Sequence, residues 1–353
     1  MPFNFFREGG ARQIRQIGQD QYTMTIQIPP DEDGRLGREC PEQTCSPGYF
    51  KVKPGTGITG GQKEAFCPYC RTCREPSDFR TKEQKRYARE VAIGEAHSVA
   101  HDMIKEAFGV DSSGRRRLLD GFITADVEIK PFHKPYVRPP HEDGLRRDVL
   151  CPNCKLDHSV FGVAVWCADC GKDIFTTHIL GELRVVKVML GDVERRRAEL
   201  GVRVATHDIE NALEDLVSVF ESSLKIEMRR WLKAKSFTAE KIDVVMKEIG
   251  SKLQSVSHAS VLIPKHCDRH LLFEQNTDFQ NRLDLIFQKR HPITHNFSVV
   301  DRSYLQRVRT GEIAGREVRV SKAEVEQAAN DVFSILENFH LRLFPEAAKA
   351  ETN

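Results

Sequence analysis

The stretch His207–Ala234, with the sequence HDIENALEDLVSVFESSLKIEMRRWLKA, decides the fold of the largest part of the chain. Its apolar residues recur at spacings of three and four, which places them on one face of a helix with 3.6 residues per turn. They are Ile209, Leu213, Leu216, Val217, Phe220 and Leu224. An apolar face of this width is stable only when other elements cover it, so the stretch predicts a long amphipathic helix inside a helical domain.

Helical patterns continue on both sides of this stretch, from about residue 178 almost to the end of the chain. We expect a charged helix over 179–200 and further helices over about 239–256 and 277–290. The last helix opens with Ser321 and Glu324, which form a capping box, and Pro345 stops it. The protein is therefore predicted to be mainly α, with a C-terminal helical bundle.

The first 150 residues are less regular. The alternating apolar residues of 22–28 predict a strand, and a helix is expected from about Thr81 to Phe108. Prolines and glycines interrupt residues 109–150, which are predicted to form a linker with a short strand near 122–129.

Nine of the ten cysteines fall into two short clusters in this N-terminal half. The second cluster has two Cys-x-x-Cys pairs separated by twelve residues. Its members are Cys151, Cys154, Cys167 and Cys170. Two such turns supply the four soft ligands that tetrahedral zinc prefers, and the apolar segment between them is predicted to form the hairpin of a zinc ribbon.

The first cluster offers five cysteines for four places. Cys67-Pro-Tyr-Cys70 forms one pair, and Cys40 and Cys45 are the preferred second pair, which leaves Cys73 spare. A ligand set that includes Cys73 is the alternative. Four cysteines close the coordination sphere of zinc, so both sites are predicted to be structural rather than catalytic, with two zinc ions per chain.

These patterns divide the chain into six parts. The expected order is an N-terminal zinc ribbon (1–80), a helix and linker (81–150), a second zinc ribbon (151–177), a connecting helix (178–202), a helical domain (203–345) and a tail (346–353).

Composition limits the functions to consider. The 353 residues include 53 Lys and Arg against 51 Asp and Glu, a net charge of +2, so nucleic acid is expected to bind at a local site rather than over a uniformly basic surface. No apolar run approaches the roughly 20 residues that span a bilayer, and the start of the chain is unlike a signal peptide. We expect a cytoplasmic protein with no membrane contact.

The segment Gln288–Asn296 reads QKRHPITHN and follows a predicted amphipathic helix. Arg290, four intervening residues and His295, with the polar His291 directly after the arginine, resemble the motif of the higher eukaryotes and prokaryotes nucleotide-binding (HEPN) family. The order of a long helix, intervening helices, a motif helix and a closing helix over residues 203–345 resembles the helical bundle of that family.

The resemblance implies a metal-independent endoribonuclease that acts as a homodimer, with a composite Arg/His site between the chains. It also implies a role in a toxin–antitoxin or antiviral system, with a neutralising or regulatory protein partner. The residue types fit such chemistry, because His exchanges protons near neutral pH and Arg carries a permanent charge that matches phosphate. In this scheme Arg290 and His295 act on RNA, and His291 orients the phosphate or Arg290.

Geometry within one chain favours the dimer. Five positions along an ideal helix turn about 500°, which leaves the side chains of Arg290 and His295 about 140° apart. Pro292 lies between them and is expected to break or kink the helix. Two alternatives stay open: the two residues cap a kinked helix at the surface, or the chain is a non-catalytic nucleic-acid-binding or adaptor protein built on its zinc ribbons.

Overall fold

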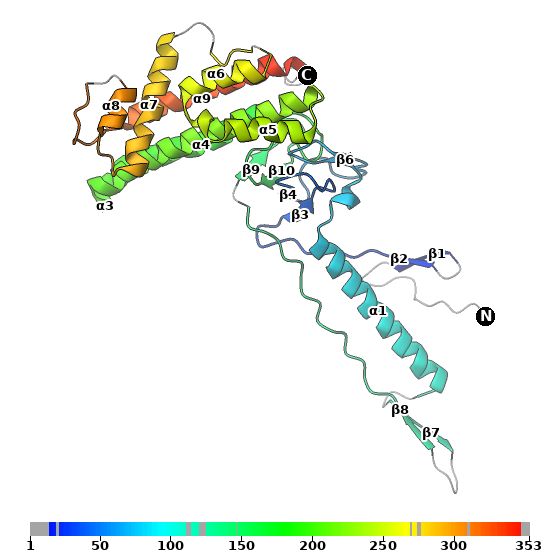
Figure 1. The fold of residues 1–353 in the computed structure, drawn as a ribbon. Helices are drawn as coiled ribbons and strands as arrows, with labels where there is room; N and C mark the ends of the chain where they lie inside the picture. The colour runs from blue at the N-terminus through cyan, green and yellow to red at the C-terminus, as the bar shows by residue number, and fades with distance from the viewer. Residues whose placement is uncertain are drawn as a thin grey trace.

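The computed structural model describes residues 14–18, 21–110, 114–119, 125–145, 147–268, 270–273, 277–308 and 311–346. Figure 1 shows a helical bundle, a small β region that carries both cysteine clusters, and an arm that projects away from them. The mainly helical fold, with small sheets and cysteine clusters in its N-terminal half, is the one that the sequence predicts. Residues 122–124 of the expected strand near 122–129 lie outside the described residues.

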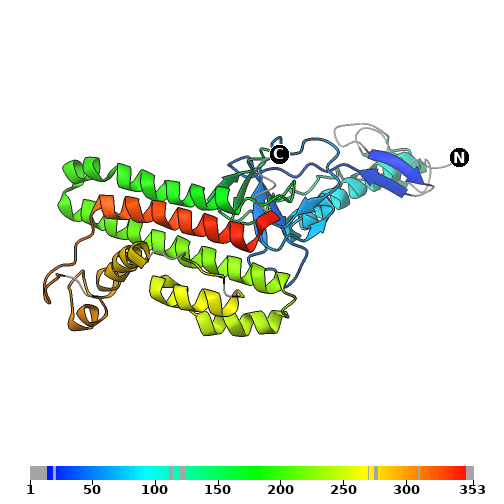
Figure 2. The same cartoon turned by 90° about the horizontal axis from the view of Figure 1, so that it is seen from above.

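The helical bundle is built around one long helix. Its elements are α2 (Phe175–Gly191), α3 (Val193–Leu200), α4 (Val202–Ala234), α5 (Ala239–Ile249), α6 (Val256–His266), α7 (Thr277–His295), α8 (Arg302–Arg307) and α9 (Lys322–Leu343), with a short 3-10 turn η2 (Lys252–Gln254) before α6. Helix α4 contacts α2, α3, α5, α7 and α9. Figure 2 shows α2, α9 and α4 lying side by side.

The apolar stripe that predicts α4 is the centre of the core. Leu213, Leu216, Phe220 and Leu224 are fully buried there, among side chains from the surrounding helices. Helix α9 begins at the expected capping box, in which the Ser321 hydroxyl accepts from the backbone N–H of Glu324 and the Glu324 carboxylate accepts from that of Ser321. These two helices confirm the predicted periodicity.

Two predicted helices differ in extent. The charged helix over 179–200 is two helices, α2 and α3, that meet at Asp192. The helix expected over 239–256 ends at Ile249, because Gly250 adopts a φ of 51° that ends the α-helical path. Periodicity alone does not reveal either break.

The two cysteine clusters share one antiparallel sheet. Its strands lie in the order β3 (Leu36–Glu39), β4 (Tyr49–Val52), β10 (Asp157–Val160) and β9 (Arg147–Leu150). Strand β4 from the first cluster pairs with β10 from the second, so the ribbons predicted as separate modules are joined. Short strands β5 (Ala65–Phe66) and β6 (Cys73–Arg74) complete the first cluster, followed by a 3-10 turn η1 (Pro76–Phe79).

The hairpin expected between the cysteine pairs of the second cluster does not form. Strand β10 ends at Val160, and only Trp166 makes an isolated bridge, to Asp173. The reason is that Val163 and Val165 are buried in the core of the helical bundle. Their apolar character therefore reflects packing against helices, and the hydrophobic core is continuous across the boundary predicted at residue 177.

The arm is built on α1 (Lys82–Phe108), which begins at a capping box formed by Thr81 and Gln84. The chain then forms the hairpin β7 (Arg115–Leu119) and β8 (Ala125–Glu128) and returns along α1. Lys134 pairs with Glu95 at 2.8 Å, and the ring of His101 hydrogen-bonds the Lys130 carbonyl. Much of the predicted linker is therefore held against the helix.

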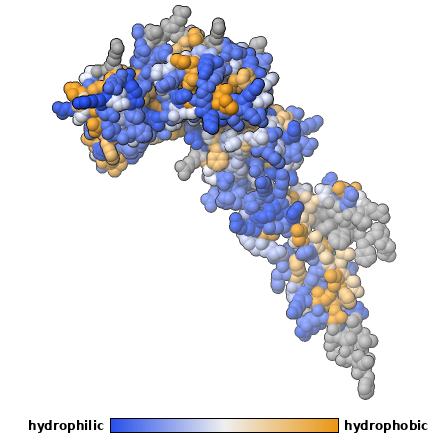
Figure 3. Space-filling model, viewed as in Figure 1, coloured by the Kyte–Doolittle hydropathy of each residue, from blue (hydrophilic) through white to orange (hydrophobic). Residues whose placement is uncertain are grey.

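The arm exposes apolar side chains. Ile93, Ile104 and Phe108 on α1 are each close to half exposed, and Figure 3 shows hydrophobic colour along the arm. The strands β1 (Ile14–Gly18) and β2 (Gln21–Met24) form a separate hairpin, so the strand expected over 22–28 is shorter than predicted. Among the described residues, no helix is both long and apolar enough to cross a membrane.

Candidate functional site

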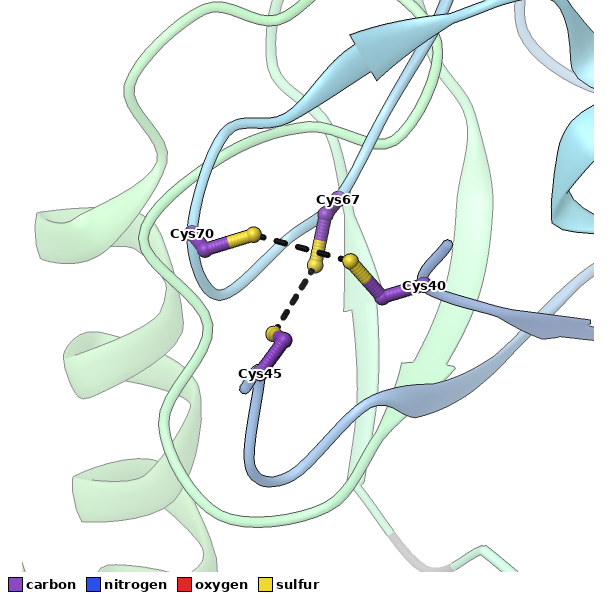
Figure 4. A group of neighbouring side chains, drawn as sticks. All are labelled: Cys40, Cys45, Cys67 and Cys70. Atoms are coloured by element: carbon purple, nitrogen blue, oxygen red, sulfur yellow. Dashed lines mark hydrogen bonds between the residues drawn. The ribbon is translucent and has the colours of Figure 1, made fainter. Parts of the chain in front are cut away.

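The first cluster brings four cysteine sulfurs to one point (Figure 4). Cys40 follows β3, Cys45 lies in the turn before β4, and Cys67 and Cys70 lie between β5 and β6. The Sγ atoms of Cys40 and Cys70 are 3.6 Å apart, as are those of Cys45 and Cys67. This is the set preferred from the sequence, and Cys73, which lies in β6, is not part of it.

The second cluster repeats this arrangement with Cys151, Cys154, Cys167 and Cys170. Sulfur–sulfur distances are 3.7 Å for Cys151–Cys170 and 3.4 Å for Cys154–Cys167.

Three of the cysteine turns share a backbone form in which the residue after the second cysteine has a positive φ. These residues are Arg71, Lys155 and Gly171, and the N–H of each donates to the carbonyl of the first cysteine of its turn. Position 171 requires glycine for a second reason, because a Cβ atom there would lie only 2.8 Å from the Phe66 ring.

The donor sets fit zinc. Four sulfurs about 2.3 Å from a central zinc ion form a tetrahedron with edges of about 3.8 Å, close to the observed distances. The sulfurs are too far apart for disulfides, whose S–S bonds are about 2.05 Å long. Hydrogen bonds from Cys40 and its neighbours lower the pKa of Cys70, whereas contact with Cys40 and burial raise the pKa of Cys67. A cation at the centre allows all four to be thiolates, so the clusters are consistent with two structural zinc ions.

The expected catalytic arginine is held by other side chains. Arg290 is half-buried on α7, and its Nη1 donates to the side-chain oxygen of Gln254 at 2.8 Å. The amide nitrogen of Gln254 donates in turn to Glu221 on α4 at 2.7 Å. The Nε–H of Arg290 is buried and finds no acceptor among the described residues. The guanidinium is thus oriented, with donor capacity left over.

The two expected histidines lie together at the surface. His291 and His295 are exposed on α7, one turn apart, with ring centroids 5.1 Å from each other. Burial, followed by the positive charges of Arg307 and His295, lowers the pKa of His291. A lowered pKa keeps this imidazole neutral near pH 7, which is the form that accepts a proton.

Pro292 was expected to break or kink the motif helix, and the expected break is wrong, because α7 continues through Pro292 to His295. Proline removes only its own N–H from the ladder, and the Pro292 carbonyl still accepts from the N–H groups of Asn296 and Ser298. Within the described part of one chain, no hydrogen bond joins Arg290 to His295. A continuous helix keeps the two side chains on different faces.

Two acidic residues of α4 hold the end of the motif helix. The hydroxyl of Thr294 donates to Glu214, and that of Ser298 donates to the buried Glu210 at 2.7 Å. The side chain of Asn296, which continues the resemblance to the HEPN motif, donates to the Val299 carbonyl at 2.7 Å. The motif therefore lies at the N-terminal half of α4.

A buried charge network at the other end of α4 was not predicted from the sequence. Asp173, just after the second cluster, lies 2.7 Å from Arg230 of α4 and 3.5 Å from His340 of α9. His340 also hydrogen-bonds the fully buried Glu227 at 3.1 Å. The sequence feature that could have revealed this network is His340, a histidine within the apolar stripe of α9. Burial lowers the pKa of His340, but the hydrogen bonds to Asp173 and Glu227 outweigh it and raise the pKa to about 9.

Comparison with known proteins adds no identification. The chain matches no model of a known protein family, no curated protein and no solved structure.

Proposed function

We propose that the chain is a metal-independent endoribonuclease of the HEPN type, active as a homodimer. The observation that carries the proposal is the end of α7, where an oriented arginine with an unsatisfied buried donor precedes two exposed histidines. The surrounding order supports it, because the long helix α4, the motif helix α7 and the closing helix α9 pack around one core.

The chemistry follows from these side chains. The 2′-hydroxyl of the RNA attacks the adjacent phosphorus and gives its proton to a neutral histidine. The bond from phosphorus to the 5′-oxygen breaks, and that oxygen takes a proton from a second, protonated histidine. Arg290 stabilises the negative charge that builds on the phosphate oxygens. The products are a 2′,3′-cyclic phosphate and a 5′-hydroxyl.

The continuous helix favours a second chain in this scheme. Since Arg290 and His295 lie on different faces of α7, a site that uses both is assembled most simply from two copies related by a two-fold axis. Two copies then supply two arginines and two histidines to one phosphate. His291 is assigned to positioning, one turn from His295.

Four cysteines in each group would fill the coordination sphere of a zinc ion and leave no position for substrate, so the role of zinc in this proposal is structural. A toxin or antiviral role with a neutralising protein partner remains part of the proposal through the family resemblance alone.

The test is cleavage of RNA in EDTA, after metal analysis shows that bound zinc is retained. Wild type is expected to cut and to leave 5′-hydroxyl ends, whereas a substrate with one 2′-deoxy sugar at the cut site resists, because the nucleophile is missing. Equal cleavage of the deoxy substrate excludes the mechanism. Absence of cleavage by wild type favours the adaptor function.

A further inference from the structure

A cleft of about 550 Å³ lies where the first cysteine cluster meets the C-terminal ends of α4 and α9. Among the residues that line it are Arg71, Trp166, Arg229, Arg230, Lys233 and Phe344, and we call it the junction cleft. Of the described residues in its wall, four are arginine or lysine and Glu346 alone is a carboxylate. This concentration contrasts with the chain's net charge of only +2.

The arginines are held against aromatic rings. The guanidinium carbon of Arg71 lies 4.4 Å from the centre of the Trp166 ring, and that of Arg230 lies 4.2 Å from the same ring. Arg230 also lies 3.7 Å from the centre of the Phe344 ring. Stacking fixes the plane of a guanidinium while its N–H edge stays free to donate, so less side-chain entropy is lost when an anion binds.

The cationic side chains of the junction cleft differ in whether they already form ion pairs. Arg230 is paired with the buried Asp173, and the exposed Arg229 lies 3.3 Å from Asp243. No carboxylate in the described part of the chain lies within ion-pair distance of Arg71 or Lys233, which are both exposed. With zinc bound, the neighbouring tetracysteine centre carries two negative charges. The cleft is therefore a site of directed contacts rather than a source of a long-range positive field.

We propose that the junction cleft binds the phosphate backbone of single-stranded RNA. Arginine and lysine side chains hold the phosphates of single strands, and in this cleft the aromatic rings fix the planes of the guanidiniums that would make those contacts. This inference rests on the proposed function, for which it defines a substrate-binding surface separate from the catalytic motif.

The separation follows from the geometry of α4. Glu214 contacts the motif helix, and Arg230 lines the cleft sixteen residues later, which is about 24 Å along a helix with a rise of 1.5 Å per residue. A strand that reaches both sites is held at the cleft while it is cut at the motif. Loss of the cleft is therefore expected to raise KM and to leave kcat unchanged.

The experiment measures binding of a fluorescein-labelled U12 oligoribonucleotide to the full-length, zinc-loaded protein that carries His295→Ala, which prevents cleavage. The test variant adds Arg71→Ala, Arg229→Ala and Lys233→Ala, all at exposed positions. The matched control adds Lys85→Ala, Arg89→Ala and Arg184→Ala, which remove the same charge from exposed helix positions elsewhere.

We expect the test variant to bind at least tenfold more weakly, with the control within twofold of its parent. Each phosphate contact on a single strand contributes about 0.7 to the slope of log affinity against log salt, so three lost contacts lower that slope by about 2. Equal affinity and slope in test and control variants overturn the proposal.

The outcome is separable from that of the proposed function. Binding is measured without cleavage, so it reports on the cleft even if wild type proves inactive. Conversely, if U12 binding is unaffected but His295→Ala abolishes cleavage, the ribonuclease stands and the junction cleft is excluded as its substrate-binding surface. Zinc content and circular dichroism of each variant show whether it is folded.

Discussion

Arg290 and His295 have different roles in one step of the proposed reaction. Loss of proton transfer typically costs about 10²–10⁴ in rate, and loss of an oriented charge costs a similar factor. Because both act in the same step, we expect the double variant Arg290→Ala with His295→Ala to be little slower than the poorer single variant. The measurement is the single-turnover cleavage rate, and effects that multiply would contradict a shared step.

The neighbours of Arg290 give a second prediction at this scale. Gln254 accepts a hydrogen bond from Arg290 and touches no proposed reacting group, so it acts by positioning. Gln254→Ala is expected to lower kcat by about tenfold with little change in KM, because Arg290 keeps its charge but loses the acceptor that orients it. A purely structural role would lower the melting temperature of Gln254→Ala without lowering the single-turnover rate of the folded protein, so thermal melts and cleavage rates are measured together.

At the scale of single residues, the sequence predicts which side chains have a chemical role better than it predicts the contacts those side chains make. The eight cysteines of the two clusters were predicted from spacing. Six of them belong to Cys-x-x-Cys turns, which are local features, and Cys40 and Cys45 were preferred as the remaining pair. The hydrogen bonds of Arg290 depend on Gln254 and Glu221, which are 36 and 69 positions away in the chain, and no local pattern reports such contacts.

The shared sheet links the two zinc sites. Since β4 pairs with β10, disruption of the second site is expected to loosen the first. Wild type is expected to bind two zinc ions per chain. In Cys151→Ser we expect zinc to leave the first site at least tenfold faster than it does in wild type, as measured by chelator competition. Cys73→Ser is the matched control, because Cys73 lies outside both groups, and it is expected to keep two zinc ions. Unchanged release from Cys151→Ser would show that the sites are independent.

The contact between the β region and the bundle is predicted to depend on pH through His340. The pKa of His340 in the folded protein is about 9 against an ordinary value of 6.5, so its stabilisation is fully present below about pH 6.5 and is lost as pH rises through 9. At roughly 1.4 kcal/mol per pKa unit, the loss is about 3 kcal/mol. Urea unfolding at pH 6.5 and pH 10 measures it. His340→Gln removes the titrating group, and an equal pH dependence in that variant would rule out His340 as the cause.

Helices with one buried face were predicted well from the sequence. Predictions were poor where contacts with distant parts of the chain determine the type of an element or where it ends. The stripe of α4 and the capping box of α9 are visible in the sequence because burial and capping act within a few residues. Val163 and Val165 were expected in a strand but pack on helices, since apolar character does not say which partner covers it. Pro292 was expected to break or kink a helix, and the helix continues through it.

The whole molecule joins the proposed catalytic motif, a central helix and a β region that carries both tetracysteine groups. The motif lies near the N-terminal end of α4 and the junction cleft near its C-terminal end, so α4 sets the distance between proposed cutting and proposed binding. Because the core is continuous across residues 163–175, we expect this distance to be fixed rather than adjustable.

A site shared between two copies predicts complementation. A chain with Arg290→Ala still supplies His295, and a chain with His295→Ala still supplies Arg290. Co-expressed with different tags and purified through both, the mixed dimer is expected to cut RNA at least tenfold faster than either variant alone. It keeps one arginine and one of the two histidines in the shared site, whereas each single variant loses both copies of one of them. The same result requires a dimer, which light scattering at micromolar concentration measures. If the mixed dimer is no more active than the single variants, Arg290 and His295 act within one chain. The continuous α7 argues against that outcome, because it holds the two side chains on different faces of one helix.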